Sequence, residues 1–266
     1  MIIAATRYGK VGGSSSGAPI CTTDTGYVAP TLYTDQETGD WELVFLGNWS
    51  GKLDRNVEVE VFAVGGGQTG SNEVDGAAGS WAQGGDGGSG GQVVTTTKQL
   101  TKETPYTVTI GGAGQPTSAF GDVTATSGGS NNGGAGAYTN GGGADAGDGG
   151  DGAHAFGRSD PADRTLYEQN LITGGTTIYF GAGGGGGSAT DGLSRKKLAG
   201  DGGTTGGGNG GSDSNNEPRD GQPGQAHTGA GGGGSRCVYV TDYPMASNPG
   251  AGGSGIVIIR NVRSST

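Results

Sequence analysis

The sequence predicts a small β-rich N-terminal module followed by a glycine-rich domain of about ten packed polyglycine-II helices with long tip loops, and almost no α-helix. Three observations lead to this prediction. Glycine makes up 65 of the 266 residues, whereas ordinary usage is roughly 7%. The glycines gather in ten runs that are separated by longer, chemically mixed segments. Strand-like apolar segments stand directly before the first run and after the last one.

The N-terminal module is expected to span residues 1–62. It holds only eight glycines and two of the three tryptophans, and Trp41–Leu46 has the apolar, aromatic composition of a strand. Val57–Val64 begins with strict alternation, which is typical of a half-buried strand. Trp41 and Trp49 could form the core of this module, or they could form a docking surface, because aromatic residues are enriched at protein interfaces.

The glycine-rich domain is expected to span residues 63–255. Isolated glycine helices or strands are unfavourable because glycine loses the most backbone entropy on folding. Polyglycine-II helices lack internal hydrogen bonds, so packed neighbours can satisfy one another's amides. The alternative is a flexible linker, or disorder of a chain with few apolar residues and a net charge of −10. We further expect a β-hairpin near 93–110, and a C-terminal strand, 256–266, that returns to the N-terminal module.

If the glycine runs cross the domain alternately, the connections after the odd-numbered runs lie together at the far end. Four of these five connections carry aromatic residues, and large aromatic side chains are effective recognition residues. The alternative for each aromatic residue is a small core within its own loop. The predicted receptor-binding residues are Trp81, Phe120, Phe156, Tyr167, Tyr179, Phe180, Tyr239, Tyr243 and Met245, and the five connections are 68–83, 115–127, 153–180, 212–220 and 235–249.

The charge of the chain limits its partners. A pI of about 4.5 argues against nucleic acid, and also against an anionic membrane surface, as the main partner. No apolar run approaches the length of a transmembrane helix. The N-terminal stretch MIIAATRYGK lacks the features of a secretory signal, so we expect none. The one basic run, Arg195-Lys196-Lys197, is placed at the near end by the same alternation and is interpreted as a solvated loop rather than a phosphate contact.

No motif for catalysis emerges, and we expect a protein that is not an enzyme. A match to G-x-G-x-x-G at 85–90 is expected by chance at this glycine density. His154 and His227 have no nucleophile in a recognisable order. Together with Cys21 and Cys237 they lack zinc-site spacing, so the thiols are interpreted as free and no metal or cofactor is expected. Asp145, Asp148 and Asp151 would line one face of a three-fold helix, as a weak cation site or, preferably, a solvated edge.

The motifs VEVFAVGGG, PYTVTIGGAG and GAGGSGIVIIRN, together with the N-terminal module, resemble the receptor-recognising adhesins at the tips of long tail fibres in T-even-type bacteriophages. The similarity covers essentially the whole chain. It implies that the protein is assembled in the host cytoplasm and lies in the virion. The N-terminal portion would cap the trimeric fibre protein, with Trp41, Phe45 and Trp49 as the fibre-attachment residues. The distal loops would bind a bacterial outer-membrane protein, a porin-like barrel possibly with lipopolysaccharide, and would determine host range.

Two other functions are considered. The first is a free polyglycine-II ice-binding protein, which would need a flat and regular face with short turns, unlike the long, mixed connections of this chain. The second is a virion-associated enzyme that degrades glycans, which would need a recognisable pair of carboxylates. The sequence therefore favours a non-enzymatic adhesin.

Overall fold

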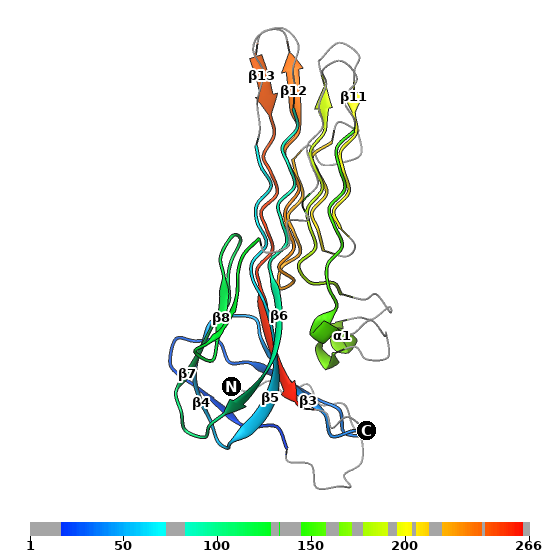
Figure 1. Cartoon of the computed structure of the whole chain (residues 1–266). Coiled ribbons are helices and arrows are strands. Elements are labelled where there is room, and N and C mark those ends of the chain that lie inside the picture. The colour runs from blue at the N-terminus through cyan, green and yellow to red at the C-terminus, as the bar shows by residue number, and fades with distance from the viewer. Residues whose placement is uncertain are drawn as a thin grey trace.

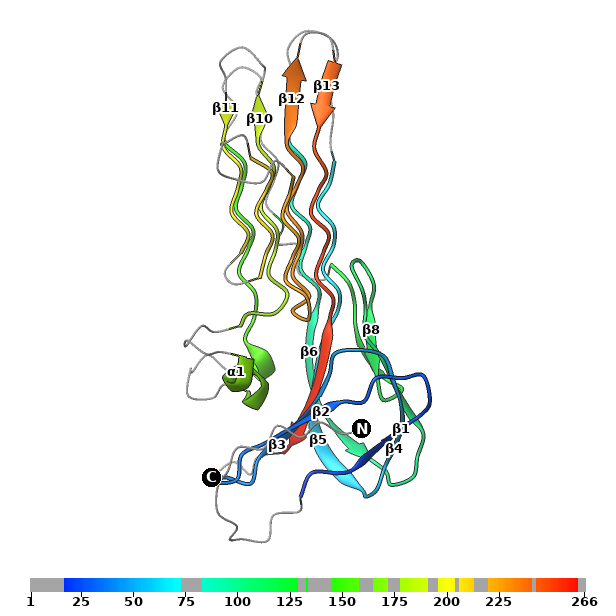
Figure 2. The same ribbon diagram turned by 180° about the vertical axis from the view of Figure 1, so that it is seen from behind.

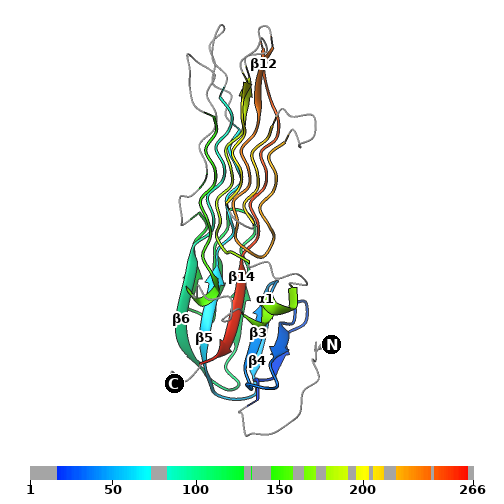
Figure 3. The same ribbon diagram turned by 90° about the vertical axis from the view of Figure 1, so that its right-hand side faces the viewer.

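A computed structural model describes residues 17–72, 83–128, 133, 145–157, 165–171, 178–190, 196–203, 206–212, 220–240 and 243–262. The molecule is elongated (Figures 1–3). A β-sheet region, called the base here, carries a bundle of long glycine-rich segments, called the stack. The stack ends in a four-stranded sheet, called the tip sheet, at the end away from the base. The tip sheet has the strand order β11-β10-β12-β13.

The base consists of two five-stranded antiparallel sheets. The first has the order β1-β4-β7-β8-β9 and the second has the order β2-β3-β14-β5-β6. The first sheet comprises β1 (Cys21–Thr23), β4 (Trp49–Leu53), β7 (Tyr106–Thr109), β8 (Thr117–Ala119) and β9 (Val123–Ala125). The second comprises β2 (Thr31–Thr34), β3 (Trp41–Phe45), β14 (Ile256–Asn261), β5 (Val57–Val64) and β6 (Val93–Leu100). The last strand of the chain, β14, therefore lies in the middle of the second sheet.

Successive residues along the strands of the second sheet belong alternately to two different hydrophobic cores. Leu43, Val61 and Ile259 point between the two sheets and pack with Trp49 and Val108 of the first sheet. Their neighbours on the same strands point to the opposite face and form a second cluster, which includes Val44, Phe62, Val64, Ile256 and Ile258. Because both faces of this sheet are buried, β14 begins with four consecutive apolar residues and lacks the alternation of apolar and polar residues of a half-buried strand.

Residues 153–157, 165–171 and 178–180, together called the covering segment here, cover the second face. They contribute a 3₁₀ turn (Ala155–Gly157) and the short helix α1 (Leu166–Leu171), and Figure 1 shows α1 beside the base. Phe180 packs on Phe62 with ring centroids 5.0 Å apart, and the backbones of Phe180 and Ala153 exchange two hydrogen bonds of 2.8 Å. The base is thus a three-layer structure in which a short, mostly irregular segment replaces a third sheet.

Lateral backbone hydrogen bonds connect the glycine-rich segments of the stack. For example, Gly184 N–H donates to the Gly88 carbonyl (2.9 Å), Gly88 N–H to Gly232 (2.7 Å), and Gly232 N–H to Gln68 (3.0 Å). Each bond joins a different pair of segments, so a segment is bonded to several neighbours at once. Buried backbone amides are therefore satisfied without side chains.

Close approach of neighbouring backbones is the reason these positions are glycine. A Cβ added at Gly88 would overlap the carbonyl group of Gln68, and one added at Gly231 would overlap the carbonyl oxygen of Gly88. Among the described residues, many other stack glycines face a neighbouring carbonyl in the same way. Any side chain there would push two hydrogen-bonded segments apart.

The structure corrects the predicted fold class. A β-rich protein with almost no α-helix is confirmed for the described residues, but the predicted glycine-rich domain of about ten polyglycine-II helices is wrong. The regular elements are strands in two antiparallel sheets and one mixed sheet, and helix is limited to α1 and the 3₁₀ turn within the described part. Composition alone did not determine the backbone geometry, because glycine populates a wide range of φ and ψ.

The strands near 93–110 also differ from the prediction. Both are present, as β6 and β7, but they do not pair with each other. β6 pairs with β5 in the second sheet, whereas β7 pairs with β4 and β8 in the first. The turn that joins them crosses from the edge strand of the second sheet to the central strand of the first, so the segment links the two sheets rather than forming a hairpin.

Candidate recognition surfaces

The tip sheet joins two hairpins that are far apart in the sequence. One consists of β10 (Ala189–Thr190) and β11 (Lys196–Lys197), and the other of β12 (Cys237–Val240) and β13 (Tyr243–Ala246). β10 pairs with β12 in parallel, with Ala189 opposite Cys237. The two hairpins therefore lie side by side at the same end of the molecule (Figure 1); the connections 191–195 and 241–242 lie outside the described residues.

Hydrogen bonds fix the ends of these hairpins that lie next to the stack. Cys237 N–H donates to the Ser188 carbonyl (3.0 Å), and Arg236 N–H donates to Ser247 Oγ (2.8 Å). Ser235 Oγ donates to Asn72 Oδ1 (2.9 Å). The tip sheet is consequently an ordered continuation of the stack.

Cys237, the first residue of β12, is fully buried with Ala189 in a small apolar cluster. Burial raises the pKa of its thiol above the ordinary value. Cys21 in β1 is half-buried, and burial, reinforced by the nearby Asp54 carboxylate, raises its thiol pKa to about 12. Both cysteines are free thiols, and both are held in the protonated, unreactive form.

Three of the nine predicted receptor-binding residues belong to the tip sheet. Tyr239 is in β12, and Tyr243 and Met245 are in β13, with Tyr239 opposite Pro244 and Val238 opposite Met245. Trp81 lies outside the described residues. The sequence therefore identified one of the two hairpins that the structure brings to this end.

The other five predicted residues lie at the base, so their predicted location at the far end is wrong. Phe120 is buried between the two base sheets, with its ring centroid 5.9 Å from that of Phe45. Phe156, Tyr167 and Phe180 are buried in the second cluster. Tyr179 is half-buried, with its ring centroid 4.6 Å from that of His154.

The physical reason is that not every glycine run crosses the molecule. After Gly111, the chain makes a tight turn with Gly114 at a φ of 68° and returns into β8 and β9 of the base. The covering segment (153–157, 165–171 and 178–180) likewise lies at the base, on its second face. Counting runs therefore misplaced the connections 115–127 and 153–180.

The basic run is misplaced by the same count. Lys196 and Lys197 form β11 in the tip sheet, opposite Thr190 and Ala189 of β10, rather than a loop at the near end; Arg195 lies outside the described residues. The sequence offered only a weak signal for this hairpin, because 188–199 contains no aromatic residue.

The three predicted attachment residues form part of the core. Trp41, Phe45 and Trp49 are 3%, 1% and 0% exposed, and the Trp49 indole N–H donates to Thr23 Oγ1 at 3.0 Å. Of the two roles left open for the tryptophans, the structure favours the core. These side chains offer no contact surface, so any contribution to attachment would act through the fold of the base.

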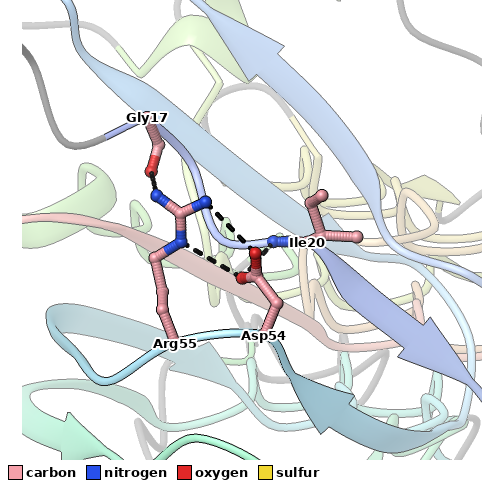
Figure 4. A network of polar contacts seen from close by, with 4 residues as sticks. All are labelled: Gly17, Ile20, Asp54 and Arg55. Atoms are coloured by element: carbon pink, nitrogen blue, oxygen red, sulfur yellow. Dashed lines mark hydrogen bonds and ion pairs between the residues drawn. The ribbon is translucent and has the colours of Figure 1, made fainter.

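A polar network secures the start of the described chain on the base (Figure 4). The Asp54 carboxylate accepts from the Ile20 amide at 2.8 Å and pairs with Arg55 at 3.1 Å, and Arg55 Nη1 donates to the Gly17 carbonyl at 3.1 Å. The hydrogen bond from Arg55 is the main cause that lowers the pKa of the Asp54 carboxyl. The network fixes the segment that leads into β1.

A row of three charged residues crosses the second sheet of the base, and two of them, Glu42 and Arg260, are buried. Arg260 of β14 lies opposite Glu42 of β3 on one side and opposite Glu60 of β5 on the other. Arg260 Nε donates to Glu60 Oε2 at 2.6 Å, and its guanidinium lies 3.7 Å from the Phe156 ring centroid. Arg260 thus connects β14 and β5 to the segment that covers them.

Glu42 fixes the covering segment from beneath. It is 2% exposed, and its Oε2 accepts the Tyr167 amide at 3.0 Å. Burial raises its pKa to about 7, and the amides of Tyr167 and Leu166 and the charge of Arg260 oppose that rise. Thr165 and Glu168 cap the start of α1 reciprocally, with Thr165 N–H to Glu168 Oε2 at 2.8 Å and Glu168 N–H to Thr165 Oγ1 at 3.1 Å.

Within the described ranges, no three His, Cys, Asp or Glu residues converge as a metal site. Asp145 and Asp148 instead accept the backbone amides of Leu198 (3.2 Å) and Asp201 (2.8 Å). Of the helices described, none is both long and apolar enough to cross a membrane.

The fold defined by these features is a β-sandwich base with a glycine-rich extension. The chain belongs to the family of glycine-rich domains, whose model matches residues 45–261. That match covers most of the base as well as the stack and the tip sheet. No curated protein and no solved structure matches the chain.

Proposed function

We propose that the protein is a non-enzymatic adhesin at the tip of a phage long tail fibre. Its base attaches to the distal end of the trimeric fibre protein, and its tip binds a bacterial outer-membrane protein and so determines host range. The protein would lie in the virion after assembly in the host cytoplasm. The sequence resemblance motivates this proposal, and membership of the glycine-rich family is compatible with it.

The observation that carries the proposal is the separation of two ends with different construction. The base buries large apolar side chains on both faces of one sheet. The tip sheet combines two hairpins at the opposite end of a backbone-bonded stack (Figure 2). A scaffold of this kind can hold variable hairpins rigidly while its own core stays unchanged.

A hairpin exchange tests receptor binding. Replacing residues 237–246 with the corresponding hairpin of another such adhesin should change the range of bacterial strains to which the protein adsorbs. The matched control replaces the exposed turn 102–103 of the base and should leave adsorption unchanged. Equal adsorption of both variants to every strain would contradict the receptor role of the tip.

Attachment is tested separately by co-expression with the fibre protein of the same phage, followed by affinity capture of that fibre protein. We expect the chain to be retained, and the hairpin exchange to leave retention unchanged. Failure of retention with normal adsorption would refute the fibre-tip position while preserving the adhesin role.

A further inference from the structure

We infer that the β10–β11 hairpin supplies a cationic rim to the tip, which contacts acidic side chains on an external loop of the receptor protein. This inference rests on the proposed function and deepens it, because it names the chemistry of the partner. It begins from the correction above: the one basic run of an acidic chain lies at the tip rather than beside the base.

The position of the lysines in the sheet sets their role. The order β11-β10-β12-β13 puts Lys196 and Lys197 on an edge strand, and Tyr239 on an inner one. Protein interfaces have apolar, aromatic centres and polar, charged rims. The tip sheet combines both kinds of residue, which favours a protein partner over a lipid headgroup.

The charge of the tip contrasts with the rest of the molecule. The four strands of the tip sheet carry two lysines and no carboxylate, although the chain as a whole has a net charge of −10. By sequence, the two hairpins together (189–198 and 236–247) hold four cationic residues and two aspartates. A local excess of positive charge on an acidic protein attracts an acidic partner and directs it to this end.

The backbone is hydrogen-bonded at β11 and directly after it. β11 pairs with β10, and after β11 the Leu198 amide donates to Asp145 Oδ1 (3.2 Å) while the Ala146 amide donates to the Leu198 carbonyl (3.0 Å). Leu198, directly after the lysines, is 59% exposed, more than any other large apolar residue among those the structure describes. The cationic rim is therefore joined to an exposed apolar contact.

Charge reversal in the full-length protein tests the inference. The probe is outer-membrane vesicles from a strain that the wild-type protein binds, and the readout is the association rate constant at about 50 mM and about 500 mM salt. We expect the pair Lys196→Glu and Lys197→Glu to slow association about tenfold at low salt, with little difference at high salt, because rim charges act mainly on encounter and are screened.

Two further variants serve as controls. Lys52→Glu with Lys102→Glu makes the same change in net charge on exposed residues of the base and should leave the rate unchanged. Lys196→Gln with Lys197→Gln should give a smaller slowing, and it replaces the Glu pair if thermal melting shows that the latter is misfolded. An unchanged rate for the tip variant, or equal slowing by the base variant, would overturn the inference.

Protease-treated vesicles, which lose external protein loops but keep lipopolysaccharide, identify the partner. We expect them to bind neither the wild type nor the variants. Lysine-dependent binding that survives protease would assign the rim to lipid phosphate and refute the protein partner. If the wild-type protein binds vesicles from no strain, the proposed adhesin function fails and this inference fails with it.

Discussion

At the scale of single residues, the base depends on charges that are buried but paired. Arg260 lies between Glu42 and Glu60 in adjacent strands and also contacts the Phe156 ring. Removal of one member of such a group is costly, because the remaining charge stays buried without its partner. Glu42 also accepts the amide of Tyr167, so this side chain couples the sheet to the segment that covers it.

The raised pKa of Glu42 predicts a pH dependence of stability. Because its pKa rises from the ordinary 4.5 to about 7 on folding, the folded state retains a proton that the unfolded state loses. The contribution, on the order of 3 kcal/mol, is fully present below pH 4.5 and is lost as the pH rises through 7. Thermal melting at pH 5, 6 and 7.5 should show a steeper fall for the wild type than for Glu42→Gln.

Parallel melting curves for the two proteins across this range would contradict the assignment. The comparison between variants is needed because other carboxyl groups also titrate. Glu58 of β5, an exposed carboxylate, provides the control: Glu58→Gln should follow the wild-type slope.

Close packing of glycine predicts a second residue-scale effect. A Cβ at Gly185 would overlap the carbonyl oxygen of Gly200, whereas one at Gly112 would have no atom within 4 Å. Gly185→Ala should therefore lower the free energy of unfolding by about 1–3 kcal/mol. Gly112→Ala should be nearly neutral in the same denaturant titration. Equal effects of the two substitutions would show that the stack is not closely packed.

At the scale of elements, β14 is the strand on which the base depends most. It pairs with β3 and β5, and its residues alternate between the two cores. Ile258 is fully buried in the second cluster, whereas Val262, just after the strand, is 39% exposed. The same kind of truncation should thus have very different effects at these two positions.

We expect Ile258→Ala to destabilise the protein by about 2–5 kcal/mol, because it leaves a cavity beneath the covering segment. Val262→Ala should stay within about 0.5 kcal/mol of the wild type, as is usual for exposed sites. Chemical denaturation followed by tryptophan fluorescence measures both. A small loss at Ile258 would indicate that the covering segment is not packed on the sheet.

The sequence allowed the individual strands to be predicted far better than their arrangement. Trp41–Leu46, Val57–Val64 and Ile256–Arg260 were correctly expected as strands, because local composition and alternation determine them. Pairing was not predictable in the same way. Whether β6 meets β7 or β5 depends on contacts between residues distant in the sequence, and no local pattern records them.

The candidate site was predictable only in part for the same reason. Tyr239, Tyr243 and Met245 were found because aromatic and apolar residues stand out in a glycine-rich chain. Lys196 and Lys197 were misplaced because their position depends on how many glycine runs cross the molecule. Phe120 and Phe180 were assigned to recognition, although their size suits them equally to a core, and burial decides between the two roles.

At the scale of the whole molecule, two kinds of core stand end to end. Side chains fill the base, and backbone hydrogen bonds replace them in the stack. Figure 3 shows the stack continuing from the strands of the base. The stack therefore keeps a defined shape although few apolar residues lie within it. Such a scaffold holds the tip sheet at a fixed position relative to the base.

Hydrogen exchange provides the test at this scale. The amides of 183–187 and 231–234 donate to carbonyls of neighbouring segments, so they should exchange slowly, like the amides of β5 and β14. Mass spectrometry of peptides from these segments measures the protection. Complete exchange within seconds, with the base still protected, would indicate a flexible tether in place of a stack.

The central position of β14 has a consequence for biosynthesis. Strands β3 and β5 leave the ribosome early, yet the strand that separates them is made only after the stack and tip have been translated. Until then, β3 and β5 each have an unpaired edge where β14 will bind. Unpaired strand edges promote aggregation. A nascent chain that stops short of residue 256 cannot close this gap, so the second sheet of the base can form completely only after β14 has been made.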